Sequence, residues 1–123
     1  MKTKKVSAVR PVLRPRFRIT SGREIAFGPG KAELLALVAE TGSIGKAAIR
    51  MGMSYMRAWS LIQTMNASFK RPVIKAVRGG QARGGAELTE TGRRVLALYR
   101  RVEKDSLKAI QADWRALRKL LHD

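Results

Sequence analysis

The side chains of this chain that are best suited to chemistry are polar and cationic groups that follow Ser54. They can hydrogen bond to the edges of bases or touch a thymine methyl group, and they are Tyr55, Met56, Arg57, Ser60 and Gln63. An arginine that donates two parallel hydrogen bonds to guanine discriminates between bases by about 1–3 kcal/mol. This set predicts base recognition in a DNA major groove, with Arg57 as the main reader.

A second set of residues suits phosphate binding. Phosphate oxygens accept hydrogen bonds from lysine and arginine, from hydroxyls, and from backbone amides at helix starts and in glycine-rich loops. The residues expected to contact a nucleic-acid backbone are Ser43, Lys46, Arg50, Ser54, Lys70, Lys75, Arg78, Gly79, Gly80, Arg83, Gly84 and Gly85.

The sequence contains few residues that could act as catalytic groups or metal ligands. The 123 residues contain no cysteine and one histidine, His122, which excludes disulfides, thiolate metal sites and a cysteine nucleophile. Glu103 and Asp105 are two residues apart on a predicted helix, so they point in different directions and form no carboxylate dyad. The chain is therefore predicted not to be an enzyme and to hold no metal or cofactor.

The charge of the chain favours a polyanionic partner. Twenty-six Lys and Arg against nine Asp and Glu give a formal net charge of +17. Residues 1–18 hold seven basic residues and no acid, and residues 41–88 hold eight basic residues and one acid, Glu87. Such clustering exceeds what solubility requires and is typical of nucleic-acid-binding proteins.

Length and hydropathy predict one small globular unit. A chain of 123 residues that is 45% hydrophobic suits a single core. No apolar run approaches the roughly 18 residues that span a membrane, and no apolar segment follows the basic N-terminus as it would in a signal peptide. Together with the lack of cysteine, this predicts a cytoplasmic, nucleoid-associated protein.

Helical spacing and capping residues predict the elements that position the two sets. A helix over about residues 29–40 precedes two short helices, over 43–51 and 54–66, that are joined by a turn at Gly52. This is the layout of a DNA-binding helix-turn-helix. The serine at the start of each short helix is expected to cap it, and Asn66 is expected to end the second. The inner face of that helix is expected to contain Ala58, Trp59, Ile62 and Met65.

Two hairpins are predicted on either side of this motif. Residues 17–27 place apolar residues on both sides of Ser21-Gly22-Arg23, which indicates a short hairpin. A second pair of strands flanks the sequence RGGQARGGA at residues 78–86. Four glycines allow this loop unusual backbone angles, and its two arginines suit phosphate or minor-groove contacts. The second hairpin is therefore predicted to be the wing of a winged helix-turn-helix.

A long C-terminal helix is predicted from Thr89 to Leu121, about 45–50 Å in length. Its apolar stripe extends beyond a domain whose radius of gyration should be about 14 Å, so a second copy of the helix is the expected cover. The alternative is that it folds back on the helix over 29–40. Both hold if its N-terminal part is covered internally and its distal part in the dimer. The residues expected to form this homodimer are Tyr99, Val102, Ile110, Trp114, Leu117 and Leu121. The predicted fold is mainly α with a small β wing. It divides into a mobile basic arm at 1–15, a winged helix-turn-helix at 16–88 and a dimerisation helix at 89–123.

The sequences TGSIGKAAIRMGMSYMRAWSLIQTMN at 41–66 and RGGQARGGAELTETGRRVL at 78–96 resemble the N-terminal DNA-binding domain of the ModE-type molybdenum-responsive transcriptional regulators. The resemblance covers about residues 17–105. It implies that the helix beginning at Ser54 is the recognition helix, that the wing grips the adjacent groove, and that flanking helices dimerise. Met56 stands where the usual pattern has lysine, so the operator is expected to differ. Full-length members carry C-terminal molybdate-binding domains, for which this chain has no room, so molybdate sensing is not expected.

The sequence therefore predicts a transcriptional regulator that binds double-stranded DNA sequence-specifically, as a homodimer on a palindromic operator. The resemblance implies a link to molybdenum metabolism. A general nucleoid or RNA-binding protein would also explain the net charge of +17, although no strand with stacking aromatic residues is present. A small oxyanion-binding protein that holds molybdate on helix starts and glycine amides is the other alternative.

Overall fold

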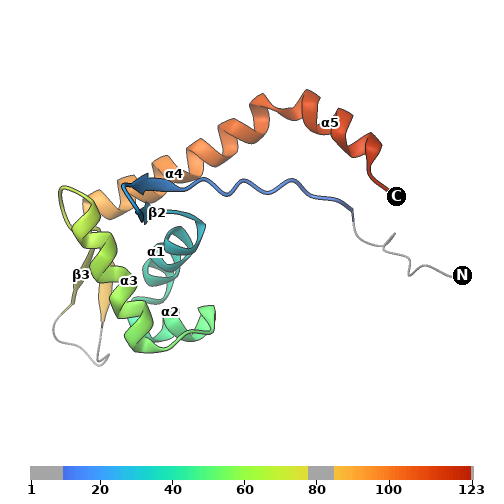
Figure 1. Cartoon of the computed structure of the whole chain (residues 1–123). Helices are drawn as coiled ribbons and strands as arrows, with labels where there is room; N and C mark the ends of the chain where they lie inside the picture. The colour runs from blue at the N-terminus through green and yellow to red at the C-terminus, as the bar shows by residue number, and fades with distance from the viewer. Residues whose placement is uncertain (1–9, 78–84, 123) are drawn as a thin grey trace, which may run out of the picture.

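The computed structural model describes residues 10–77 and 85–122. A helical body carries two small hairpins, and two further helices extend away from it (Figure 1). The helices are α1 (Pro29–Thr41), α2 (Ile44–Met51), α3 (Tyr55–Ser68), α4 (Glu90–Ala109) and α5 (Gln111–Leu120). The strands are β1 (Ile19–Ser21), β2 (Glu24–Phe27), β3 (Ile74–Ala76) and β4 (Ala86–Leu88). The predicted fold class, mainly α with a small β wing, is confirmed.

One apolar core holds the body together. Leu34, Leu35 and Val38 of α1 are fully buried at its centre, where α2 and α3 pack against them. The small residues Ala47 and Ala48 of α2 are also buried, which lets the backbones of these helices approach closely. The helices α1, α2 and α3 each bury one face against the others, as the sequence pattern predicts.

The N-terminal hairpin of β1 and β2 closes the other side of the core. Ile19 pairs with Phe27 and Ser21 pairs with Glu24 in an antiparallel ladder. The ring of Phe27 is fully buried and meets the rings of Phe69 and Tyr99 edge to face, with centroids 5.7 and 5.0 Å apart. The hairpin predicted at residues 17–27 is confirmed.

The second hairpin is tied to α3 by a single side chain, Asn66. Its amide oxygen accepts hydrogen bonds from the backbone amides of Val73 (2.8 Å) and Ile74 (3.2 Å), and its amide nitrogen donates to the carbonyl of Ile74 (3.1 Å). The expectation that Asn66 ends its helix is wrong, since α3 continues to Ser68. Asn66 instead fixes the start of β3, because its amide supplies both a donor and an acceptor to one stretch of backbone.

Gly92 lets the backbone of α4 approach the start of β3. A Cβ atom at this position would lie only 2.0 Å from the carbonyl oxygen of Val73, whose side chain is fully buried. Thr89 caps α4 by accepting a hydrogen bond from the amide of Gly92 (2.9 Å), as predicted for this threonine. The contact therefore joins α4 to the base of the second hairpin.

The prediction of one continuous C-terminal helix is wrong. The chain leaves helical geometry at Ile110 (φ −103°, ψ 14°), so that α4 and α5 are separate helices. Neither proline nor glycine marks the break, which is why the sequence did not indicate it. No residue of α5 is buried. In Figure 1, α4 leaves the body and α5 continues beyond it.

Tyr99, which is expected to contribute to the homodimer, packs largely inside its own protomer. Tyr99 is only 6% exposed, because its ring packs against Phe27. Its hydroxyl donates a hydrogen bond of 2.7 Å to the carbonyl of Phe17. Both contacts lie within one protomer.

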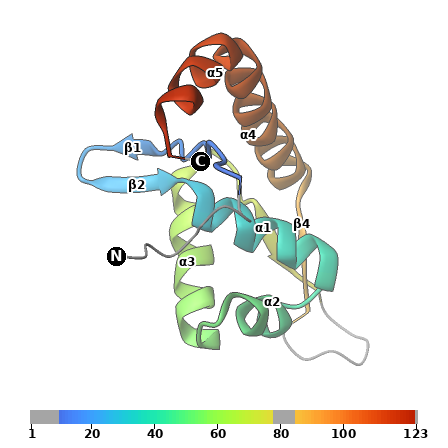
Figure 2. The same cartoon turned by 90° about the vertical axis from the view of Figure 1, so that its right-hand side faces the viewer.

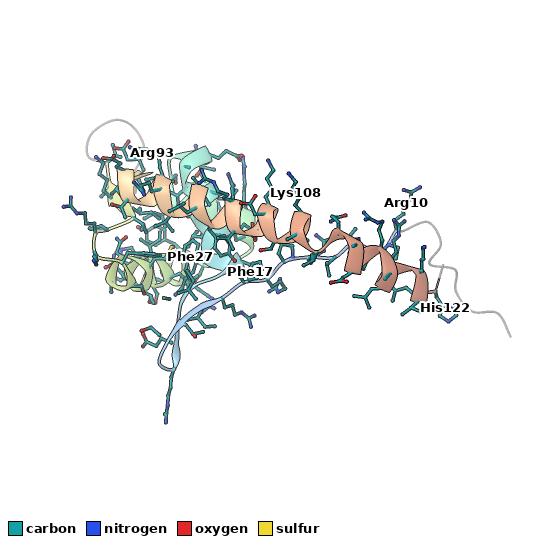
Figure 3. All side chains as sticks on the ribbon, turned by 90° about the horizontal axis from the view of Figure 1, so that it is seen from above. Arg10, Phe17, Phe27, Arg93, Lys108 and His122 are labelled. Atoms are coloured by element: carbon teal, nitrogen blue, oxygen red, sulfur yellow. The ribbon has the colours of Figure 1, made fainter. Side chains whose placement is uncertain are left out.

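From Phe17 back to Arg10 the chain runs alongside α4 and toward α5 (Figure 3). None of the helices in the described residues is long and apolar enough to cross a membrane.

The contact at Gly92 gives a stability prediction. We expect Gly92→Ala to lower the free energy of unfolding by about 1–3 kcal/mol or more, because the added methyl group overlaps the Val73 carbonyl. Alanine is otherwise the better helix former by about 1 kcal/mol, so the sign of the change is diagnostic. Urea denaturation followed by circular dichroism measures it. In the control, Gly30→Ala, a Cβ atom meets nothing within 4 Å and stability should not fall. Equal responses of the two variants would contradict the overlap.

Candidate nucleic-acid interface

The helix-turn-helix predicted from the sequence is present as α2, a tight turn and α3. Gly52 forms the turn with φ of 68°, a left-handed conformation that favours glycine. Its amide and that of Met53 then donate to carbonyls at the end of α2, which satisfies the last turn of this helix. Figure 2 shows α2 crossing the lower end of α3, where α3 begins.

Both helices of the motif begin in the same way. The hydroxyl of Ser43 accepts a hydrogen bond from the amide of Lys46, and that of Ser54 accepts one from the amide of Arg57, each at 3.1 Å. The predicted caps are confirmed. Neither helix carries an acidic residue in its first turn, so the positive end of each helix dipole has no carboxylate of its own helix beside it. Such helix starts favour an anionic ligand.

The outward side of α3 brings the predicted base-reading residues together. Its buried stripe consists of Ala58, Ile62 and Met65. The five residues expected to read bases are all exposed on the remaining surface: Tyr55, Met56, Arg57, Ser60 and Gln63. Helical spacing places Met56, Ser60 and Gln63 opposite the stripe, with Tyr55 and Arg57 on its two flanks.

Trp59 lies on this surface as well, although the sequence analysis placed it in the core. Its side chain is 43% exposed. The helical period carries the buried stripe through positions 58, 62 and 65, which leaves position 59 about 100° away from its centre. Trp59 is therefore an additional candidate contact beside the predicted set.

The base of the wing is attached to the start of α2. Ser43 forms an isolated antiparallel bridge with Gly85, and the amide of Ala86 donates to the carbonyl of Gly42 (3.0 Å). The strands below the loop are paired as predicted, with Ile74 opposite Leu88. Of the predicted wing residues, Gly85 is buried at this junction. The others, Arg78, Gly79, Gly80, Arg83 and Gly84, lie outside the described residues.

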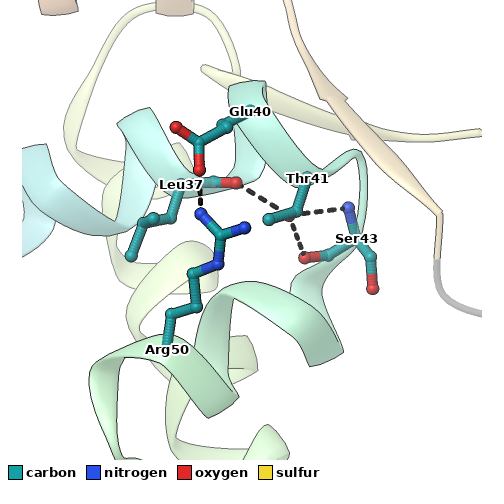
Figure 4. A network of polar contacts seen from close by, with 5 residues as sticks. All are labelled: Leu37, Glu40, Thr41, Ser43 and Arg50. Atoms are coloured by element: carbon teal, nitrogen blue, oxygen red, sulfur yellow. Dashed lines mark hydrogen bonds and ion pairs between the residues drawn. The ribbon is translucent and has the colours of Figure 1, made fainter.

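The turn between α1 and α2 is held by a small polar network (Figure 4). The hydroxyl of Thr41 donates to the carbonyl of Leu37 (2.7 Å) and accepts from the amide of Ser43 (3.2 Å). Beside it, Arg50 of α2 forms an ion pair with Glu40 of α1. These contacts fix the start of α2, where a phosphate is expected to bind.

The lysines and arginines predicted to contact the DNA backbone fall into two groups. Arg50 and Lys75 have carboxylate partners, Glu40 and Glu87, in pairs whose side chains are more than half exposed. Pairs of this kind contribute only about 0–1 kcal/mol, so a phosphate can replace the carboxylate at little cost. Lys46 and Lys70 are exposed and form no ion pair within the described residues.

The described residues contain no group of three or more metal-ligating side chains. The arrangement therefore consists of an exposed helix face for bases, two helix starts without acidic residues, and cations on either side. This arrangement suits a polyanionic ligand.

Comparison with known proteins identifies the family. Residues 30–93 match the bacterial regulatory helix-turn-helix proteins of the lysR family, which is slightly more than half of the chain. The chain belongs to this family. The match agrees with the predicted helix-turn-helix and with a regulatory role.

Several relatives carry names connected with molybdenum, which agrees with the resemblance to ModE-type regulators. The chain is 40% identical over 86 residues to the molybdenum-pterin-binding protein MopB of Rhodobacter capsulatus, covering 70% of this chain and 32% of MopB. It is 38% identical over 71 residues to the DNA-binding transcriptional dual regulator ModE of Escherichia coli (strain K12), covering 58% of this chain and 27% of that protein. The chain thus spans about a third or less of the length of these relatives.

Solved structures show the same fold. The CbnR_DBD–DNA complex superimposes with a TM-score of 0.55 at 22% identity, over 72% of this chain and 95% of that one. Full-length CbnR complexed with its target DNA gives a TM-score of 0.51 at 23% identity, over 71% of this chain and 28% of that one. The winged helix-turn-helix architecture is confirmed by these similarities.

The cap at Ser54 gives a second stability prediction. Ser54→Ala removes the acceptor of the Arg57 amide and should lower the free energy of unfolding by about 0.5–2 kcal/mol. Thermal unfolding followed at 222 nm measures the change. Ser60→Ala, an exposed position in the same helix, is the control and should shift stability by no more than about 0.5 kcal/mol. An unchanged melting temperature in Ser54→Ala would show that the cap does not hold the start of α3.

Proposed function

We propose that this protein regulates transcription by binding double-stranded DNA sequence-specifically, as a homodimer on a palindromic operator. The observation that carries the proposal is the exposed outer face of α3, whose first turn holds no acidic residue, together with the bridge between Ser43 and Gly85 that joins the start of α2 to the wing. This arrangement suits a recognition helix in the major groove with backbone contacts on both sides. Such a protein would act on the nucleoid, in the cytoplasm.

The names of the relatives support a link to molybdenum metabolism. The similar segments include the helix-turn-helix, and the remaining two thirds of MopB have no counterpart in these 123 residues. The proposed link concerns the genes that the protein controls.

The proposed division of contacts follows from position. Bases would be read by Tyr55, Met56, Arg57, Ser60 and Gln63, all of which are exposed on α3. Backbone phosphates would be bound at the starts of α2 and α3, by Lys46, Arg50, Lys70 and Lys75, and by the wing. Base contacts determine sequence preference, whereas phosphate contacts strengthen binding to every duplex.

A selection experiment tests the function and this division together. Sequences bound from a pool of random duplexes should contain two inverted half-sites about one helical turn or a multiple apart. Arg57→Ala should relax the preference at one position in each half-site, a loss of about 1–3 kcal/mol of discrimination. Lys46→Ala should weaken selected and scrambled duplexes by the same factor. Fluorescence anisotropy on both duplexes compares the variants.

Two outcomes would contradict the proposal. A pool that shows no enriched sequence, or equal affinity for RNA in competition, would indicate a general nucleic-acid-binding protein. Identical effects of Arg57→Ala and Lys46→Ala on matched and scrambled DNA would show that Arg57 does not read bases.

The homodimer is proposed from apolar surface that one protomer leaves open. Val102, Ile110, Leu117 and Leu121 are each at least 40% exposed along α4 and the segment that follows it. Trp114 is half-buried. Near the body, an apolar groove of about 410 Å³ lies between the N-terminal hairpin and α4 and continues this surface. A second copy that covers it would bury an extended apolar stripe.

Introducing a charge tests this interface. Val102→Glu should shift the protein from dimer to monomer in sedimentation equilibrium, because it places a carboxylate in the buried stripe. Lys104→Glu makes a larger change in charge two residues away, on a different face of α4, and should leave the dimer intact. A monomeric wild-type chain, or equal dissociation of both variants, would contradict this interface.

A further inference from the structure

A second groove borders the surface of α3 that is proposed to read bases, and the two share Arg57. It has a volume of about 480 Å³ and separates the start of α1 from the first two turns of α3. Four of its lining residues are cations: Arg16, Arg18, Lys31 and Arg57. The rest of its lining is apolar or glycine, and no acidic residue lines it.

Three of the four cations are available to a ligand. In the described part of the chain the only ion pairs are those of Arg50 and Lys75, so the three arginines of the groove have no carboxylate partner there. All three are exposed. Lys31 is different, because its ammonium donates to the carbonyl of Ile25 at 2.6 Å and so ties α1 to β2. Burial lowers the pKa of Lys31, an effect that the nearby charge of Glu24 opposes.

The backbone holds the two N-terminal arginines at the groove. Between them, the carbonyl of Phe17 accepts the hydrogen bond from Tyr99. The aliphatic part of the Arg18 side chain packs over Gly28: a Cβ atom at Gly28 would lie 3.3 Å from Cγ of Arg18. Burial raises the pKa of the Tyr99 hydroxyl, Glu103 adds to this rise, and the charges of Arg16 and Arg18 oppose it. Both arginines thus lie near a fixed point of the core while their side chains remain exposed.

The start of α1 adds to the positive potential of the groove. Gly28 offers no side chain to cap this helix, and its first turn carries no acid. The amides of that turn therefore add partial positive charge to that of the arginines. This contribution is secondary to the guanidinium groups, which donate in the forked geometry that suits phosphate.

We propose that Arg16 and Arg18 bind a phosphodiester of the DNA backbone, on the strand that borders the major groove occupied by α3. The ligand is a tetrahedral oxyanion that is part of a duplex already held by α3. Exposed ion pairs are weak on their own, and they become effective when the anion is tethered at the site by other contacts. Arg57, which lines this groove and also belongs to the reading surface, makes the two sites continuous. This inference rests on the proposed DNA-binding function and extends its contacts beyond the helix-turn-helix and wing.

The test compares two double variants of equal charge. Arg16→Gln with Arg18→Gln removes two charges at the groove and keeps most of each stem, while Arg100→Gln with Arg101→Gln removes two exposed charges on α4. Affinity for the selected duplex is measured by anisotropy at several salt concentrations. The groove variant should bind about tenfold more weakly at a fixed salt concentration, the loss of about one charged hydrogen bond. The slope of log affinity against log salt should become shallower by about 1–2, and that of the control should not change.

The outcomes separate this inference from the function on which it rests. Equal affinities and slopes for the groove variant and wild type would overturn the inference, with DNA binding by the wild type intact. Wild type that binds duplex DNA weakly and without salt dependence would overturn both. Calorimetric titration of wild type with molybdate and with phosphate tests for a free oxyanion, and saturable binding lost only in the groove variant would also overturn the duplex assignment. If the double variant unfolds at a lower temperature than wild type, Arg16→Gln alone is used, because Arg16 does not lie against Gly28.

Discussion

The arrangement of this protein depends on one junction, where the turn after α1 meets the end of the wing. The carbonyl of Gly42 accepts a hydrogen bond from the amide of Ala86. Ser43 forms a β-bridge with Gly85, and its hydroxyl caps α2. The same few residues thus fix the start of one helix of the motif and the return of the wing. Contacts to the two sides of a DNA groove can only be made together if these elements keep a fixed separation.

Locally encoded features were predictable from the sequence. The three helix caps, the turn at Gly52 and the strands around the wing depend on neighbouring residues, whose preferences for these roles have a clear physical basis. The exposed reading residues followed from helical spacing once the helix start was known. The predicted backbone contacts could be located in part only, since most of the wing lies outside the described residues.

Features that depend on distant partners were not predictable. Asn66 looks like a helix terminator by type, and only the approach of β3 gives its amide three backbone hydrogen bonds. Tyr99 lies on the apolar stripe of α4, and it is buried because Phe17 and Phe27, more than 70 residues away, come to meet it. The groove at Arg16 and Arg18 combines the N-terminal segment, the start of α1 and α3, which no local pattern connects.

The hydrogen bond from Tyr99 to Phe17 also divides the charges of the N-terminal segment. Arg16 and Arg18 stay close to the body, whereas the chain before them follows α4 toward α5, so that Arg10 lies near the far helix (Figure 3). The charges near α5 add to the long-range field of the protein. They would accelerate diffusional encounter with any polyanion and contribute nothing to the choice among sequences. A single tyrosine hydroxyl thus separates the two arginines that are proposed to strengthen a bound complex from the charges that would only speed its formation.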